Sequence, residues 1–246
     1  MEQLWITALL NRLFGGPVNA ILQALPRSFH PANPSAPISN AVAMEILVIA
    51  ILLLIFLWIR SQLSVEKPGG SQHLAETLHE FITNQSEEII GHHSEKFTPF
   101  LASLFLFILL MNLIGLIPGF ESPTVNPAVP FGCALVAFFY YNLHGIRKQG
   151  PIKFVKHFAG PVWWMAWIIF PIEIISTLAR VMSLTIRLYA NIFAGDMVTA
   201  AFFTLIPIGI PVIFLALHVG VSFLQAYVFV LLTTIYLSGV VAEEEH

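Results

Sequence analysis

The stretch SLTIRLYANIFAGD, residues 183–196, places one arginine, Arg187, in the middle of a long run of apolar side chains. A guanidinium keeps its charge in a protein, and at the centre of a bilayer that charge costs about 3 kcal/mol or more. Ionisable residues at such depth mark ion or substrate pathways. The stretch therefore predicts a membrane-embedded helix with Arg187 as its candidate functional residue.

The whole sequence has the composition of a membrane protein. Of its 246 residues, 57% are hydrophobic and 10% are charged, whereas soluble domains carry about 25% charged residues. The formal net charge of −3 comes without a basic stripe, which argues against nucleic acid as a partner. The single cysteine, Cys133, excludes an internal disulfide and a thiolate metal cluster, and we expect it to be a small core residue.

The N-terminal part differs from the remainder of the chain. Residues 5–25 predict a short amphipathic or interfacial helix, and the proline-rich residues 26–37 predict an exposed loop. We expect a single membrane domain, in which residues 1–40 form an interfacial or periplasmic segment and residues 41–246 form the transmembrane core.

Several apolar segments of this core approach the length of about 20 residues that crosses a bilayer. Three spans are predicted at residues 41–59, 97–117 and 128–143. Apolar residues also recur at helical spacing in the polar segment 73–95, which predicts an amphipathic helix on the membrane surface. Basic residues favour cytoplasmic loops and gather after the first and third spans, so we expect the N-terminus outside; they are Arg60, Lys67, Lys96, Arg147, Lys148, Lys153 and Lys156.

Residues 162–206 and 211–241 form two longer apolar segments. As one helix, the roughly 45 residues of the first would extend about 65 Å. It is either two spans or one helix that runs obliquely in the membrane, and we expect a long tilted helix bent near Gly195. The predicted fold is all-α, with about five to six hydrophobic helices, of which the last two are long, tilted and form a membrane-embedded hairpin.

Helical phase, at about 100° per residue, places polar residues of these segments on shared faces. Glu173, Arg180 and Arg187 are seven residues apart and share one face. Asn191 joins that face, while Asp196 lies on the opposite side of a straight helix. The last segment has a second polar face made by His218, Ser222, Gln225 and Tyr236. Two polar stripes on two apolar helices are what a buried ion path requires.

Some polar residues also have a structural interpretation. Asn112, Ser222 and Tyr236 are expected to form interhelical hydrogen bonds rather than to handle ions. Glu45 is either solvated near the outer interface or functional. His218 is either a satisfied core histidine or a proton relay, because its proton affinity lies near neutral pH.

The two arginines of residues 162–206 differ in their possible partners. Arg180 can pair with Glu173 or reach the interface. Arg187 has no acidic residue three or four positions away, so its partner must lie on another helix or another chain.

Three motifs resemble subunit a of the F-type ATP synthases. They are PIEIIS at 171–176 together with residues 183–195, MNLIGLIPG at 111–119, and LQAYVFVLLTTIYL at 224–237. The motifs stand in the family's order, and the similarity extends over about residues 40–246.

The resemblance implies a proton-translocating stator subunit of the F0 sector in the bacterial inner membrane, which is not an enzyme by itself. Such a subunit faces a rotating ring of c subunits, each with an intramembrane carboxylate, and two offset half-channels carry protons to and from that ring. Arg187 matches the family's essential arginine, which keeps the ring carboxylate ionised and prevents a proton short-circuit. Proton-path positions of the family are matched by Glu173, Asn191, Asp196, His218 and Gln225. The implied partners are the c-ring, the b subunits of the peripheral stalk and the rest of the ATP synthase, and neither a cofactor nor a metal is implied.

The sequence departs from the family at two positions. Asp196 stands where relatives usually have His or Glu, and Val181 stands where many have Pro. The coupling ion, H⁺ or Na⁺, stays open, because the site on the ring decides it.

Two other classes of membrane protein are compatible with the apolar composition. A secondary proton-coupled transporter usually has internal repeats with broken helices in matching halves, and the sequence holds no second copy of the Arg187 motif. A haem-binding respiratory subunit would use His218, but its second intramembrane histidine could only be His144, at a helix end. Both fit the sequence less well than an ATP synthase subunit.

Overall fold

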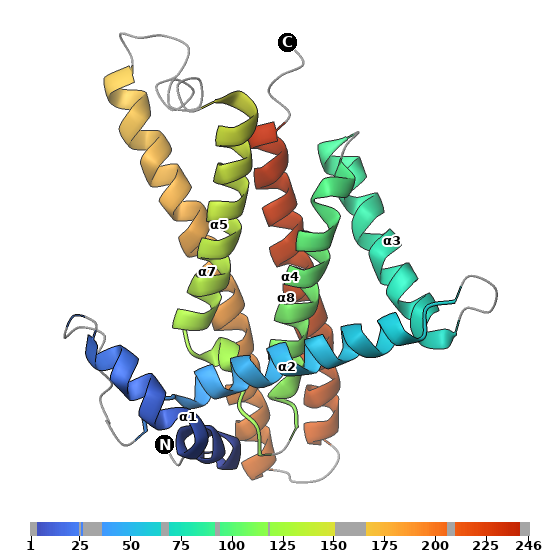
Figure 1. Cartoon of the computed structure of the whole chain (residues 1–246), viewed down its shortest axis with the longest axis vertical. Helices are drawn as coiled ribbons and strands as arrows, with labels where there is room; N and C mark the ends of the chain where they lie inside the picture. The colour runs from blue at the N-terminus through green and yellow to red at the C-terminus, as the bar shows by residue number, and fades with distance from the viewer. Residues whose placement is uncertain are drawn as a thin grey trace.

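The computed structural model describes residues 4–24, 26, 36–64, 69–91, 94–117, 119–150, 166–205 and 210–241. Within these residues the regular structure is entirely helical (Figure 1). The elements are α1 (Trp5–Ala24), α2 (Asn40–Ser61), α3 (Gly70–Ile90), η2 (Ser94–Lys96), α4 (Thr98–Ile114), η3 (Pro123–Val125), α5 (Ala128–Gln149), α7 (Ala166–Leu205) and α8 (Ile210–Val241). The predicted all-α fold is confirmed.

Helix α8 is the central element of the packing. It lies against α3, α4, α5 and α7, and in Figure 1 it runs beside α4 and α5 along the long axis of the molecule. Fully buried apolar side chains fill the space between the helices, among them Leu101 and Ile108 of α4, Leu188 of α7 and Leu237 of α8. Burying such a side chain away from water stabilises a fold by roughly 1.5–3 kcal/mol. Within a bilayer the alternative surroundings are lipid rather than water, so close packing stabilises the contacts between helices there.

Four of the helices, α2, α5, α7 and α8, are long and apolar enough to cross a membrane. The predicted span at 97–117 is shorter than expected, because α4 ends at Ile114 after 17 residues. The chain turns there, with the Leu116 N–H donating to the Leu113 carbonyl at 3.0 Å. A Cβ at Gly115 would lie 2.7 Å from the Ser122 Cβ, so only glycine allows the returning loop to pass this close.

Helix α7 decides between the two interpretations of residues 162–206. It is one continuous helix of 40 residues, about 60 Å long, so the single-helix alternative is confirmed over its described part. Its tilt in the membrane and the bend near Gly195 stay predictions. Figure 1 shows it sloping past α5 rather than lying parallel to it. It continues through Gly195, where the Thr199 hydroxyl donates to the Gly195 carbonyl at 2.8 Å. No proline or glycine interrupts residues 172–194, which favours a continuous helix over this stretch. Pro171, which has no N–H to donate, lies within the second turn of α7.

Helices α7 and α8 pack closely side by side and run in opposite directions (Figure 1). This is the predicted pair of long hydrophobic helices, and the residues that join them, 206–209, lie outside the described part of the chain. Because the two helices carry both predicted polar stripes, their contact brings the candidate site residues together.

Helix α5 is longer than the predicted span at 128–143. It continues to Gln149 and ends at Gly150, whose φ of +79° is readily adopted by glycine. Arg147 and Lys148 occupy its last turn, where cations are stabilised by the helix dipole. The Lys148 Nζ also donates to the Val241 carbonyl at 2.7 Å, which joins the C-terminal ends of α5 and α8.

Both predicted amphipathic helices exist. Helix α1 is held by Asn11, whose Nδ2 donates to the Ile38 carbonyl at 3.0 Å and whose Oδ1 accepts from the Ile38 N–H at 2.9 Å. Helix α3 begins and ends earlier than the predicted 73–95 and packs against α4 and α8.

The placement of both helices at the membrane surface stays a prediction, as does the topology. The predicted loop at 26–37 and the basic residues Lys67, Lys153 and Lys156 lie wholly or largely outside the described residues.

Candidate functional site

Arg187 lies at the border between the packed face and the open face of α7. Val181, Leu184 and Leu188 point into the bundle and are buried, whereas Ile186 on the other side is 55% exposed. The Arg187 side chain is half-buried, and its Nη2 donates to the Ser183 Oγ at 3.3 Å. No carboxylate among the described residues forms an ion pair with it. The expectation that its partner lies off its own helix agrees with this arrangement.

Asp196 and His218 form a close pair across the α7–α8 contact. The Asp196 Oδ1 lies 3.6 Å from the His218 Nδ1, an ion-pair distance when the ring is protonated and slightly too long for a hydrogen bond. His218 is only 4% exposed, and its buried Nε2 has no hydrogen-bond partner among the residues that the structure describes. Burying an unpaired polar nitrogen is costly, so this atom is suited to a water or an exchangeable proton.

Gly195 allows the His218 ring to reach α7, and sequence reasoning did not identify this. A Cβ at position 195 would lie 3.0 Å from the His218 Nδ1 and 3.2 Å from its Cε1. Cβ atoms rarely lie this close to other side-chain atoms. The missing side chain at position 195 therefore determines how closely the His218 ring approaches α7. The signal was present in the sequence as a glycine next to Asp196 inside a helix, where glycine is unfavourable by roughly 1 kcal/mol relative to alanine.

Glu173 and Arg180 form the second ion pair of α7. The Arg180 Nη2 lies 3.7 Å from the Glu173 Oε1, which confirms the structural alternative predicted for Arg180. The Arg180 guanidinium also lies over the ring of Tyr236 on α8, with its Cζ 5.4 Å from the ring centroid. We expected the Tyr236 hydroxyl to form an interhelical hydrogen bond. Among the described residues, Tyr236 instead makes contacts through its ring, so that prediction is wrong there.

Among the described residues, no hydrogen bond joins Arg187 to either of the two predicted amide residues of the path. Asn191 is exposed on α7 and Gln225 is half-buried on α8, and the described hydrogen bond of Arg187 goes to Ser183 instead. Both amides lie on the two helices that carry the site, so their predicted role in its surroundings stays a prediction.

Asn112 connects α4 to α8 and to the loop before α5. Its Nδ2 donates to the Ser222 carbonyl at 3.4 Å, and its Oδ1 accepts from the Thr124 hydroxyl at 2.9 Å. The Ser122 hydroxyl donates in turn to the Met111 carbonyl at 2.9 Å. The interhelical hydrogen bond predicted for Asn112 is confirmed. Ser222 contributes its carbonyl, while its buried Oγ has no hydrogen-bond partner within the described part of the chain. Sequence reasoning missed Ser122 and Thr124, because their loop carries no periodic signal.

Cys133 and Glu45 lie away from these contacts. Cys133 is a free, buried cysteine of the core, as predicted. Glu45 is a half-buried residue of α2, and its role stays open.

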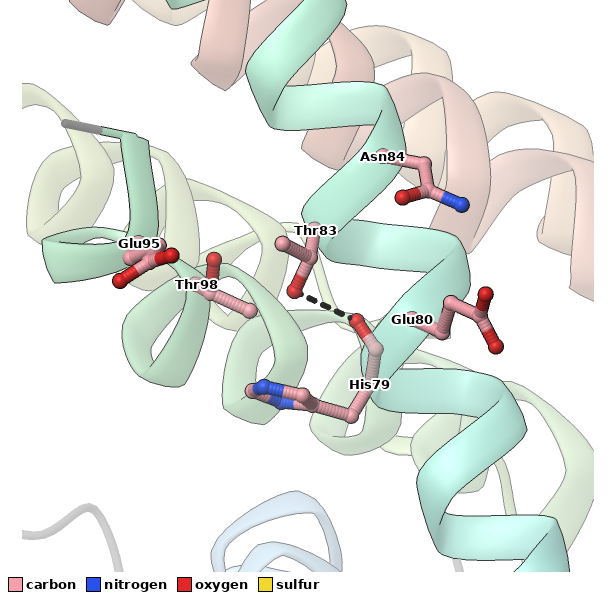
Figure 2. Close-up of a pocket in the computed structure, with 6 residues that line it drawn as sticks. All are labelled: His79, Glu80, Thr83, Asn84, Glu95 and Thr98. Carbon is pink, nitrogen blue, oxygen red and sulfur yellow. Dashed lines mark hydrogen bonds between the residues drawn. The ribbon is translucent and has the colours of Figure 1, made fainter. Parts of the chain in front are cut away.

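A polar pocket of about 540 Å³ lies between α3 and the start of α4 (Figure 2). Its wall includes a hydrogen bond from the Thr83 hydroxyl to the His79 carbonyl, 2.8 Å long. None of the predicted site residues lines it, so the pocket does not belong to the candidate ion path; its lining residues are His79, Glu80, Thr83, Asn84, Glu95 and Thr98.

Comparison with known proteins agrees with the geometry. The family described as ATP synthase A chain matches residues 42–238. The chain is 55% identical over 243 residues to the ATP synthase subunit a of Koribacter versatilis, covering 98% of each chain. It is 47% identical over 213 residues to the ATP synthase subunit a of Solibacter usitatus, covering 87% of this chain and 91% of the relative. With a family match over most of its length and relatives this similar, the chain belongs to the ATP synthase subunit a family.

Proposed function

We propose that this chain is the proton-conducting stator subunit that faces the c-ring, and that Arg187 is the fixed charge opposite the ring carboxylates. The observation that carries the proposal is the position of Arg187. It lies on an apolar helix, at the edge of the packed face, and pairs with no carboxylate among the described residues. A charge left unpaired at membrane depth calls for a partner from outside the chain.

Membership of the family sets the framework. The protein is a multi-pass protein of the bacterial inner membrane, belongs to the proton-translocating F0 sector of an ATP synthase, and is not an enzyme by itself. Its neighbours in that complex include a c-ring. We propose direct contact of α7 with that ring, and contact elsewhere with the b subunits.

The charge of Arg187 acts on each ring carboxylate in turn. A nearby positive charge favours the ionised form of a carboxyl group, so the carboxylate opposite Arg187 gives up its proton. It must take up a proton again before it enters lipid, where an unpaired charge is unfavourable. The fixed cation also repels protons and so prevents direct passage between the half-channels. The driving force is about 2.3 kcal/mol per proton per 100 mV.

Asp196 and His218 are the proposed exchange groups of one half-channel. Their contact at 3.6 Å across α7 and α8 supports the assignment, and so does the buried, unpartnered His218 Nε2. Glu173 remains the group predicted for the other half-channel. It precedes Arg187 by two steps of seven residues, about 21 Å along the helix axis. Asn191 and Gln225 are proposed to line the surroundings of Arg187.

The test is the variant R187A in the intact ATP synthase. We expect the complex to assemble at wild-type yield but to lose proton-driven ATP synthesis by more than a hundredfold, since nothing else keeps the ring carboxylate ionised. Synthesis is measured in inverted membrane vesicles, and assembly by the amount of c-ring that co-purifies. The matched control is R147A, which removes an exposed arginine at the end of α5 and should leave synthesis unchanged. Wild-type coupling in R187A would falsify the proposal.

A further inference from the structure

Helix α7 carries a second arginine on the face of Arg187. Arg180 precedes Arg187 by seven residues, so the two guanidinium groups lie on nearly the same side, about 10 Å apart along the axis. Both belong to an apolar helix that is long enough to cross a membrane. A face that carries two cations could bind a mobile carboxylate at either one.

The surroundings of Arg180 differ from those of Arg187. Glu173, on the same helix, lies 3.7 Å from the Arg180 guanidinium. Tyr236, on α8, offers its ring at 5.4 Å, a distance at which a cation is attracted to the aromatic face. Arg180 is thus held from two sides by a carboxylate and a ring.

The aromatic face is itself fixed by a third helix. The Tyr236 ring lies 6.1 Å from the ring of Tyr141 on α5, and Tyr141 is only 3% exposed. Aromatic rings at this separation attract one another. Three helices, α5, α7 and α8, therefore determine where the Arg180 charge lies.

Arg187 lacks any such neutralisation within the described residues. Its described hydrogen bond goes to the uncharged Ser183 hydroxyl, 3.3 Å away. Of the two cations on this face, one has its counter-ion on the same helix and the other has none among the described carboxylates.

We propose that Glu173 and Tyr236 are positioning residues that neutralise and hold Arg180, so that Arg187 is the one cation presented to the moving carboxylate. We name Glu173, Arg180 and Tyr236 the Arg180 counter-ion site. The inference rests on the proposed function of Arg187, and for Glu173 it replaces the proton-carrying role in the other half-channel with the role of a counter-ion to Arg180.

Loss of the counter-ion has a defined consequence. Without Glu173, Arg180 is an unpaired cation one helical heptad from Arg187. A ring carboxylate that passes it stays ionised there, because a nearby positive charge favours the ionised form. The carboxylate then cannot enter lipid, and rotation of the ring slows.

The test is a double-mutant cycle in the intact complex, read out as ATP-driven proton pumping into inverted vesicles and as co-purified c-ring. We expect E173Q to assemble and to lower pumping at least fivefold, because Arg180 is left unpaired. R180Q should keep at least half of the wild-type rate, and E173Q/R180Q should return to the R180Q rate. The matched control is E173Q/R147Q, which has the same net charge but neutralises the exposed Arg147, and it should stay as slow as E173Q.

A different result overturns the proposal. If E173Q/R180Q is as slow as E173Q, Glu173 acts as a proton-carrying group and not as a counter-ion. Unchanged pumping in E173Q also overturns it. This result is distinguishable from a failure of the proposed function of Arg187. In that case R187A would still carry out proton-driven ATP synthesis.

Tyr236 supplies a second readout if E173Q does not assemble. Y236F keeps the aromatic face and should pump at the wild-type rate, whereas Y236L removes it and should lower pumping at least twofold. R180Q should then suppress the defect of Y236L, which a merely structural role of Tyr236 would not allow. Equal rates in Y236F and Y236L, or no suppression, contradict the proposal.

Discussion

At the scale of single residues, the site depends on small distances between α7 and α8. Asp196 and His218 are 22 positions apart in sequence yet 3.6 Å apart in space. Gly195 makes this approach possible, since any Cβ there would lie 3.0 Å from the His218 Nδ1. Because this contact is tight, a methyl group added at position 195 is expected to displace the His218 ring.

We expect G195A to lower proton pumping severalfold while the complex still assembles. Alanine favours a helix over glycine by roughly 1 kcal/mol, so any loss must come from displacement of the His218 ring. Pumping in inverted vesicles and the yield of intact complex measure the two effects. The control is G220A on α8, where an added Cβ would meet nothing within 4 Å. Equal pumping in G195A and G220A would show that the ring adapts and that its depth is unimportant.

At the scale of elements, α3 is joined to the helix that carries His218. The Tyr227 hydroxyl donates to the Gln85 Oε1 at 2.8 Å, and the Ser238 hydroxyl donates to the Ile89 carbonyl at 2.8 Å. The Phe81 ring packs against Tyr227 with centroids 5.6 Å apart. An amphipathic helix with few buried side chains is thus held by two hydrogen bonds and a ring contact.

Removing one of these hydrogen bonds should loosen α3. Y227F keeps the ring but loses a bond worth about 1 kcal/mol, so backbone amides of α3 should exchange with deuterium about fivefold faster. Hydrogen–deuterium exchange of the detergent-solubilised complex measures this. Y189F provides a matched control on α7, because the described contact of Tyr189 is a ring contact with Phe193. If α3 exchanges equally fast in both variants, the Gln85 contact does not hold it.

At the scale of the whole molecule, a buried polar network connects the bundle to the loop between α4 and α5. Asn112 is 0% exposed and bonds to both the Ser222 carbonyl and the Thr124 hydroxyl. Ser122 extends the network to Met111. Such networks stabilise a fold when every member is satisfied and destabilise it when one is removed.

N112L should therefore destabilise the whole bundle. It keeps the branched shape but removes the amide that accepts from the Thr124 hydroxyl and donates to the Ser222 carbonyl. Thr124 then keeps only the Ser122 hydroxyl, 2.7 Å away, and we expect the free energy of unfolding to fall by about 1–3 kcal/mol. Thermal denaturation of the purified protein in detergent measures the loss. The control is N142L, since Asn142 bonds to the Phe138 carbonyl of its own helix and should cost less. Equal losses in the two variants would mean that the network does not join α4 to α8.

Much of the architecture could be predicted from local signals. The apolar runs gave the helices, the absence of proline or glycine in residues 172–194 indicated the long α7, and the heptad spacing of Glu173 and Arg180 anticipated their pairing. The errors lie where local signals compete with contacts distant in sequence. Helix α4 stops at Ile114 because the returning loop packs on Gly115, and Tyr236 meets Arg180 through its ring because α8 brings that face to α7.

The sequence by itself determined that this is an all-α membrane protein, that it belongs among ATP synthase a subunits, and that Arg187 has no acidic partner nearby on its own helix. The fold class and the lack of an acidic partner for Arg187 follow from composition, periodicity and spacing within one segment, whereas the family follows from the resemblance of three ordered motifs. Only the tertiary structure decided that His218 meets Asp196 beside Gly195, and that Arg180 pairs with Glu173 while no carboxylate in the described part of the chain pairs with Arg187. Such contacts depend on how α5, α7 and α8 pack, because side-chain distances across helices are set by interlocking shapes and not by the order of residues.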